Sequence, residues 1–313
     1  MVFRLIMMML PTLSVCTSLL AMDFRWFEDA IPVRHGINQE IMNVEADVPE
    51  VYAVIEEKTS YNGTEVPLRV YLPNENKDIP VALFIHGGGW VAGSLDTHDN
   101  MARYLCKNAQ IAVVAVEYTN SPEGKFPLPL EQCYQALLWI GEQSCLDPSR
   151  LAVVGDSAGG NMTAAVCLLN RDRGGSDIGL QVLINPVTDL TCGGTLLEQG
   201  DPIDDVMRWI ATQYVSDPND VYNPCASPFL AEDLSRLPPA LVILAEYDRL
   251  LKDGQRYADR LSSSGIPTTV FTQKGIGHLA GDGARASKAA QESLDVAAEA
   301  LHKRLRILDG IQR

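Results

Sequence analysis

The sequence predicts an α/β fold in which a mostly parallel central sheet is flanked by helices. Past residue 50, strand-like and helix-like segments alternate along the chain, as they do in parallel sheets with helices on both faces. Several strand-like segments are short, continuous apolar runs, which is typical of strands buried on both sides. A glycine-rich turn at 155–160 joins one of these runs to a helix-like segment.

The expected elements follow one another in a regular order. The first strands, at 51–58 and 68–72, precede a turn-rich stretch at 73–78. Buried-type strands are expected at 81–85, 111–118, 151–154, 180–184, 240–244 and 268–272. Helices are expected at 128–143, where apolar residues recur with helical spacing, and at 157–170, 254–264 and 284–308.

Two segments, residues 1–50 and about 191–228, do not follow this rhythm. Both could lie over the carboxyl edge of the sheet, where ligands bind in open α/β folds. We therefore expect one catalytic domain at 51–313 with a helical cap, built from the N-terminal segment 1–50 and the insertion at 191–228.

The N-terminal residues have two interpretations. Arg4 precedes an uncharged, largely apolar run that ends near Ala21, so residues 1–21 resemble a secretion signal. Pro11 interrupts the run and Met22 could be the natural start, which favours an ordered part of the cap instead. We expect a cytoplasmic protein, exported only if 1–21 is a signal peptide, and no stable membrane insertion, because the run is marginal in length for a span.

Charge and cysteine content limit the partners. The formal charge of −15 for 313 residues argues against nucleic acid and anionic membranes, which would repel the protein. No pair of the seven cysteines has CxxC spacing, so we expect no metal site. We expect no organic cofactor either. Cys192 and Cys225 flank the insertion and could be bridged in an oxidising compartment. The expected partner is a small molecule, and a homodimer is left open.

The motif GDSAGG at 155–160 points to Ser157 as a nucleophile. It follows the strand at 151–154 and opens a helix, the context of a G-x-S-x-G elbow that holds a serine in a strained turn. The alternative is a glycine-rich turn with a capping serine, since serine is a favoured N-cap. The strand before the motif and the helix after it favour the nucleophile.

The motif HGGGW at 86–90 supplies candidate donors for a developing oxyanion. Consecutive glycines are tolerated where the backbone must approach a ligand closely, and their N–H groups could stabilise negative charge on an attacked carbonyl. A phosphate loop is disfavoured because neither G-x-G-x-x-G nor G-K-[ST] is present. His86 is expected to brace this loop through a hydrogen bond.

A serine nucleophile needs a base and an acid that orients it. His278 follows the last expected strand, and in proteins with this elbow the histidine comes after the serine and the acid. Among the other histidines, His35 and His302 are expected to be solvated and His98 to be structural. For the acid, Glu246, Asp248 and Asp253 all follow the strand at 240–244. Asp248 is favoured, Glu246 is the reserve, and Asp253 looks like the N-cap of the next helix.

These blocks resemble the hormone-sensitive-lipase-like family of α/β-hydrolases, in particular its bacterial esterase branch, over about residues 66–300. The resemblance rests on HGGGW at 86–90, THD at 97–99, GDSAGG at 155–160 and the acid block at 247–254. It implies an α/β-hydrolase fold with a cap over the site. The site residues that it implies are the triad Ser157, Asp248 and His278, with oxyanion donors Gly88, Gly89 and Ala158.

The resemblance implies a serine carboxylesterase that hydrolyses short- to medium-chain acyl esters through an acyl-enzyme. The same machinery could act on amides, lactones or acetylated sugars. A non-catalytic receptor of this fold is the other alternative, but such receptors have lost the histidine that is present here as His278. Two departures stand out: residues 117–123 lack the arginine of the family's Asp-Tyr-Arg run, which puts its usual salt bridge in doubt, and Leu279-Ala280 replaces the common Gly-Phe.

Overall fold

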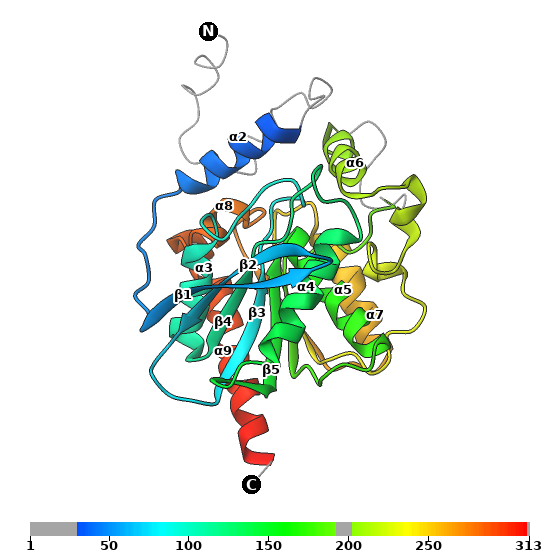
Figure 1. Ribbon diagram of the computed structural model, residues 1–313. Coiled ribbons are helices and arrows are strands. Elements are labelled where there is room, and N and C mark those ends of the chain that lie inside the picture. The colour runs from blue at the N-terminus through cyan, green and yellow to red at the C-terminus, as the bar shows by residue number, and fades with distance from the viewer. Residues whose placement is uncertain (1–29, 192–201, 312–313) are drawn as a thin grey trace.

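A twisted sheet runs through the centre of the protein (Figure 1). The structure is a computed structural model that describes residues 30–191 and 202–311. In this part of the chain the strands form one eight-stranded sheet in the order β1-β2-β4-β3-β5-β6-β7-β8. β1 and β2 pair antiparallel, as do β2 and β4, and all other neighbours are parallel. The bounds are β1 Ala53–Tyr61, β2 Thr64–Leu72, β3 Ile79–Ile85, β4 Ala112–Val116, β5 Leu146–Asp156, β6 Leu180–Ile184, β7 Ala240–Ala245 and β8 Thr268–Gln273. The mostly parallel sheet predicted from the sequence is confirmed.

The first hairpin is longer than expected. Asn62 and Gly63 both have positive φ, at 49° and 79°, which is the conformation that a tight hairpin turn requires and that Asn-Gly favours. The strands on either side therefore pair over their full length, from Ala53 opposite Leu72 to Tyr61 opposite Thr64.

Helices cover both faces of the sheet (Figure 1). On one face α3 (Asp99–Ala109) packs against α9 (Gln291–Ile311), and on the other lie α4 (Leu128–Ile140), α5 (Ala158–Asp172) and α7 (Leu251–Ser263). Helix α3 was not predicted from the sequence. The helix expected at 284–308 is interrupted, since α8 (Ala280–Ala284) and the 3-10 turn η4 (Lys288–Ala290) precede α9.

The interruption has a local cause. Ala286 adopts φ 52°, a left-handed conformation that ends a helix. Ser287 is extended, with φ −67° and ψ 165°, and its hydroxyl donates to Asp282 Oδ1 at 2.8 Å. The chain therefore turns between α8 and α9 instead of continuing one helix.

Two helices lie beyond the sheet at the end where β3 and β5 point (Figure 1). They are α2 (Ala30–Met42) and α6 (Pro202–Tyr214), which belong to the two segments assigned to the cap. The signal-like run at 1–21 and Cys192 lie outside the described residues, while Cys225 carries a free thiol. Within the described ranges, no helix combines the length and apolarity needed to cross a membrane.

Asp253 does not cap α7 as the sequence suggested. The helix begins at Leu251, so Asp253 lies inside its first turn and is fully buried. Its two carboxylate oxygens accept hydrogen bonds from the backbone N–H and the hydroxyl of Thr188, both at 2.6 Å. Asp253 thus joins α7 to the segment after β6, and burial raises its pKa to about 6.

This buried carboxyl predicts a pH-dependent stability. Its pKa in the folded protein is above that in the unfolded chain, so its contribution is full below about pH 4 and is lost as the pH rises through about 6. Relative to Asp253→Asn, wild type is expected to lose about 2 kcal/mol of unfolding free energy between about pH 4 and pH 7. Urea denaturation at several pH values measures this. Asp259→Asn, on the exposed side of α7, is the control, and a wild-type slope in Asp253→Asn would contradict the prediction.

Candidate active site

Ser157 lies in the sharp turn between β5 and α5. Its φ is 54°, which non-glycine residues rarely adopt and which is held here by the surrounding contacts. Its N–H donates to Ile184 O at 2.8 Å. A Cβ on Gly155 would lie 2.3 Å from Gly159 O, and one on Gly159 would lie 2.0 Å from Ile85 O. Only glycines let the strand and the helix approach this closely, which leaves the serine partly exposed at the turn.

His278 and Asp248 complete a hydrogen-bonded chain with this serine. His278 Nε2 is 3.0 Å from Ser157 Oγ, and Nδ1 is 2.8 Å from Asp248 Oδ2. With the proton on Nδ1, the ring donates to the carboxylate and accepts from the hydroxyl. The structure therefore brings together the three residues selected from the sequence, from the carboxyl ends of β5, β7 and β8.

The electrostatics of the pair suit a base held in place by an acid. Burial lowers the pKa of His278, but the charge and hydrogen bond of Asp248 outweigh it and raise the pKa above its ordinary value. The Asp248 side chain is only 3% exposed. Its second oxygen accepts from Leu250 N at 2.9 Å, so the carboxylate is fixed on both sides.

The other candidate acids and bases lie elsewhere. Glu246 accepts from Gly275 N at 2.9 Å and so braces the loop that carries His278. His35 is exposed, as expected. His302, expected to be solvated, is instead partly buried, and its Nδ1 lies 2.8 Å from Ala109 O, because α9 packs on α3.

The HGGGW loop presents free backbone donors beside the nucleophile. Gly88 and Gly89 have φ of 116° and 61°, and a Cβ on Gly88 would lie 2.2 Å from Ala92 O, so side chains are excluded there. Within residues 30–191 and 202–311, the N–H groups of Gly88, Gly89 and Ala158 donate to no protein acceptor. Three unpaired donors near a serine can bind an oxyanion.

Asp156, directly before the nucleophile, anchors this loop, a role that was not predicted from the sequence. Its Oδ1 accepts from Gly87 N at 3.0 Å, and its Oδ2 lies 3.5 Å from His98 Nε2. Both side chains are buried. Burial raises the pKa of Asp156, but His98 and the Gly87 hydrogen bond outweigh it and hold the pKa below its ordinary value. A charged residue at the end of a buried strand was the signal for this anchor.

His86 braces the same loop, as expected. Its Nδ1 is 2.8 Å from Gly87 O, and its ring stacks on Tyr118 with centroids 4.1 Å apart. Burial lowers the pKa of His86 to about 3. The ring is therefore neutral at physiological pH and adds no charge beside the oxyanion donors.

Comparison with known proteins identifies the family. Residues 82–280 match the model of a family described as alpha/beta hydrolase fold. The chain belongs to the hormone-sensitive-lipase-like family of α/β-hydrolases. This α/β-hydrolase is 36% identical to an arylesterase of Saccharolobus solfataricus, over 71% of this chain and 74% of the relative. It is 38% identical to the carboxylesterase NlhH of Mycobacterium tuberculosis, over 72% and 74%.

Solved structures agree with this assignment. A hyperthermophilic esterase from Pyrobaculum calidifontis matches this α/β-hydrolase with a TM-score of 0.83 and 34% identity, over 92% of this chain and 95% of the other. The metagenomic carboxylesterase EstE1 matches with a TM-score of 0.81 and 35% identity, over 88% and 98%. The family resemblance and the fold predicted from the sequence are both confirmed.

Proposed function

We propose that this α/β-hydrolase is a serine carboxylesterase that acts through an acyl-enzyme, with Ser157 as nucleophile, His278 as general base and Asp248 as the acid that orients it. One observation carries the proposal: the hydrogen-bonded chain from Ser157 Oγ through His278 to Asp248, at a positive-φ turn beside free backbone donors. The names of the relatives, which include arylesterase and carboxylesterase, support an ester as the substrate.

Each group has a defined part in the reaction. Ser157 Oγ attacks the ester carbonyl while its proton passes to His278 Nε2, and Asp248 stabilises the imidazolium that forms. The N–H groups of Gly88, Gly89 and Ala158 stabilise the negative oxygen of the tetrahedral intermediate. The alcohol leaves with the proton from His278. Water then attacks the acyl-enzyme with His278 again as base, releasing the acid and restoring the serine.

The cap is proposed to restrict the acyl chain. The side chain of Ile210, on α6, lies 3.2 Å from the position that a Cβ on Gly89 would occupy. An apolar wall at this distance from an oxyanion donor leaves room for short or medium acyl groups more readily than long ones. The ethyl acetate hydrolase of Pseudomonas putida, 34% identical over 79% of this chain, supports a short substrate.

Activity on p-nitrophenyl esters from acetate to palmitate tests the proposal. We expect the highest kcat/KM between acetate and octanoate and a decline of about tenfold or more for palmitate, because Ile210 beside the oxyanion loop restricts the room for a long chain. Failure to hydrolyse any chain length with folded protein would count against an esterase and favour the amide, lactone, acetylated-sugar or receptor alternatives. A maximum at palmitate would contradict the restriction by the cap.

We also propose a cytoplasmic location. In the described part of the chain, Cys106, Cys133, Cys145, Cys167 and Cys225 are free thiols, as expected in a reducing compartment. Mass spectrometry of the protein from fractionated cells tests this. An exported form that lacks residues 1–21 would contradict it.

A further inference from the structure

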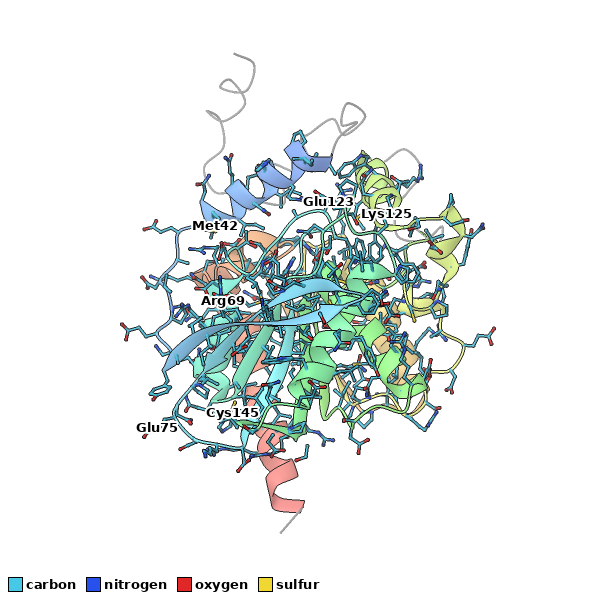
Figure 2. All side chains as sticks on the ribbon, viewed as in Figure 1. Met42, Arg69, Glu75, Glu123, Lys125 and Cys145 are labelled. Atoms are coloured by element: carbon cyan, nitrogen blue, oxygen red, sulfur yellow. The ribbon has the colours of Figure 1, made fainter. Side chains whose placement is uncertain are left out.

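The N-terminal helix α2 reaches the oxyanion loop through Arg34. Its Nε donates to Val91 O at 2.6 Å and its Nη2 to Ser121 O at 2.7 Å. The guanidinium also forms a two-point contact with Glu123, with Nη1–Oε1 at 3.0 Å and Nη2–Oε2 at 2.6 Å. Figure 2 labels Glu123 in the region between α2 and α6. The Arg34 side chain is 20% exposed, so this cation is largely covered, and its four hydrogen bonds go to the loops beneath it.

A second residue on the same face of α2 holds the other end of the loop. Asn38 lies four residues after Arg34, and residues with this spacing are neighbours on a helix surface. Asn38 Oδ1 accepts a hydrogen bond from Gly93 N at 2.9 Å. Arg34 and Asn38 therefore hold Val91 and Gly93, the two ends of a three-residue segment.

This segment determines where the oxyanion donors lie. Gly88 O accepts from Val91 N at 3.2 Å and from Ala92 N at 2.9 Å, which closes a tight turn over Gly88 and Gly89. The turn leaves no space between Gly88 and Ala92 O. A displacement of residues 91–93 is therefore transmitted directly to the N–H groups of Gly88 and Gly89.

The segment that contains Glu123 links the same loop to α6. Ser121 N donates to Trp90 O at 2.7 Å. Lys125, labelled in Figure 2, donates to Thr212 O at 2.9 Å and to Val215 O at 3.1 Å, at the end of α6. Both helices assigned to the cap thus contact the segment 121–125, and this segment in turn contacts the HGGGW loop.

We propose that Arg34, assisted by Asn38, is a positioning residue that holds the oxyanion loop in its catalytic conformation. This inference rests on the proposed esterase function. Glu123 neutralises the Arg34 charge and fixes the plane of the guanidinium, so that its Nε is aimed at Val91 O. This ion pair also bears on the departure from the family pattern at 117–123. This chain has Thr119 where the family's run has arginine, and the guanidinium that pairs with Glu123 comes instead from α2.

Kinetics of Arg34→Ala, Arg34→Lys and Asn38→Ala test the proposal. We expect Arg34→Ala to lower kcat for p-nitrophenyl acetate by about 10- to 100-fold with a change in KM below about threefold, because misplaced donors weaken the transition state more than the substrate complex. Lysine lacks the planar fork and should recover only part of the loss. Asn38→Ala should lower kcat by about three- to tenfold.

A second readout separates positioning from stability. A p-nitrophenyl phosphonate places its phosphoryl oxygen where the oxyanion forms, so its rate of attachment to Ser157 should fall in proportion to kcat. Arg173→Ala is the matched control, because Arg173 makes a similar two-point contact with Glu131, between α4 and the end of α5. Arg173→Ala should change neither kcat nor the rate of phosphonylation by more than about twofold. Thermal unfolding of each variant identifies the temperature at which all are folded.

The outcomes are distinct. Folded Arg34→Ala and Asn38→Ala with wild-type kcat and wild-type phosphonylation would overturn the inference and leave the esterase proposal standing. If Arg34→Ala does not fold, Arg34→Lys and Asn38→Ala decide by the same criterion. A wild type that neither hydrolyses esters nor is phosphonylated at Ser157 would overturn the proposed function, and this inference with it.

Discussion

Replacing Ser157 with alanine is expected to lower kcat for ester hydrolysis by about a millionfold, since loss of the nucleophile in a serine hydrolase leaves only the contribution of the oxyanion donors and binding. The hydrogen bond from Ser157 Oγ to His278 is the route by which the nucleophile is activated. Alanine and serine are similarly strained at the positive φ of 54° that this position adopts. The substitution should therefore leave the midpoint of thermal unfolding nearly unaltered.

The measurement is steady-state hydrolysis of p-nitrophenyl butyrate by purified wild type and variant, with circular dichroism to establish folding. Ser263→Ala, at the exposed end of α7, is the control and should retain wild-type activity. A loss below about a hundredfold would show that a group other than Ser157 performs the attack.

Replacing Asp248 with asparagine is expected to lower kcat by about ten thousandfold, because an amide no longer fixes the tautomer in which His278 Nδ1 carries the proton. The carboxylate is almost fully buried, and its Oδ2 lies 2.8 Å from His278 Nδ1. The loss should appear in kcat more than in KM, since the substrate complex does not depend on the imidazolium.

The pH profile of kcat/KM should also change in a defined direction. The base works only when neutral, so activity is lost as the pH falls through the pKa of His278. Asp248 raises this pKa above the ordinary histidine value. Wild type should therefore lose activity at a higher pH than Asp248→Asn, whose acid limb moves to lower pH. Profiles from about pH 4 to pH 9 measure both limbs.

Glu246→Gln is the control for this substitution. Its amide oxygen can still accept from Gly275 N, which Glu246 contacts at 2.9 Å, and it does not touch the imidazole. We expect kcat within about threefold of wild type and an unchanged acid limb. An Asp248→Asn variant with near wild-type activity, or with its acid limb at the same pH as wild type, would contradict the assigned role.

The sheet and the candidate site were predictable because their signals are local. Buried-strand runs such as 81–85 and 240–244 are apolar throughout. The glycine-rich turn after the first and the acidic turn after the second therefore lie at the same carboxyl edge of the sheet. The order of Ser157, Asp248 and His278 along the chain then specified which side chains meet there. The Asn62-Gly63 turn was an equally local signal that went unused, and it would have given the full length of β1 and β2.

What the sequence could not predict depends on contacts between distant residues. Asp253 has the residue type of an N-cap, but its partner Thr188 is 65 residues away, and this contact draws the carboxylate into the core. Arg34 contacts Val91, which is 57 positions further along the chain, and Glu123, which is 89 positions further along. No periodicity or motif in α2 indicates these partners. His302 contacts Ala109 O because α9 packs on α3. This contact could not be predicted, since α3 itself was not predicted.

Trapping the acyl-enzyme tests the central claim most directly. Wild-type protein mixed with p-nitrophenyl butyrate and quenched in acid within milliseconds should carry a butyryl group on the peptide that contains Ser157, found by mass spectrometry. One equivalent of p-nitrophenol per protein should be released in a burst if deacylation is the slower step. A butyryl group on another residue, or none under quenching conditions that retain the phosphonylated Ser157, would contradict an ester hydrolysis that proceeds through this serine.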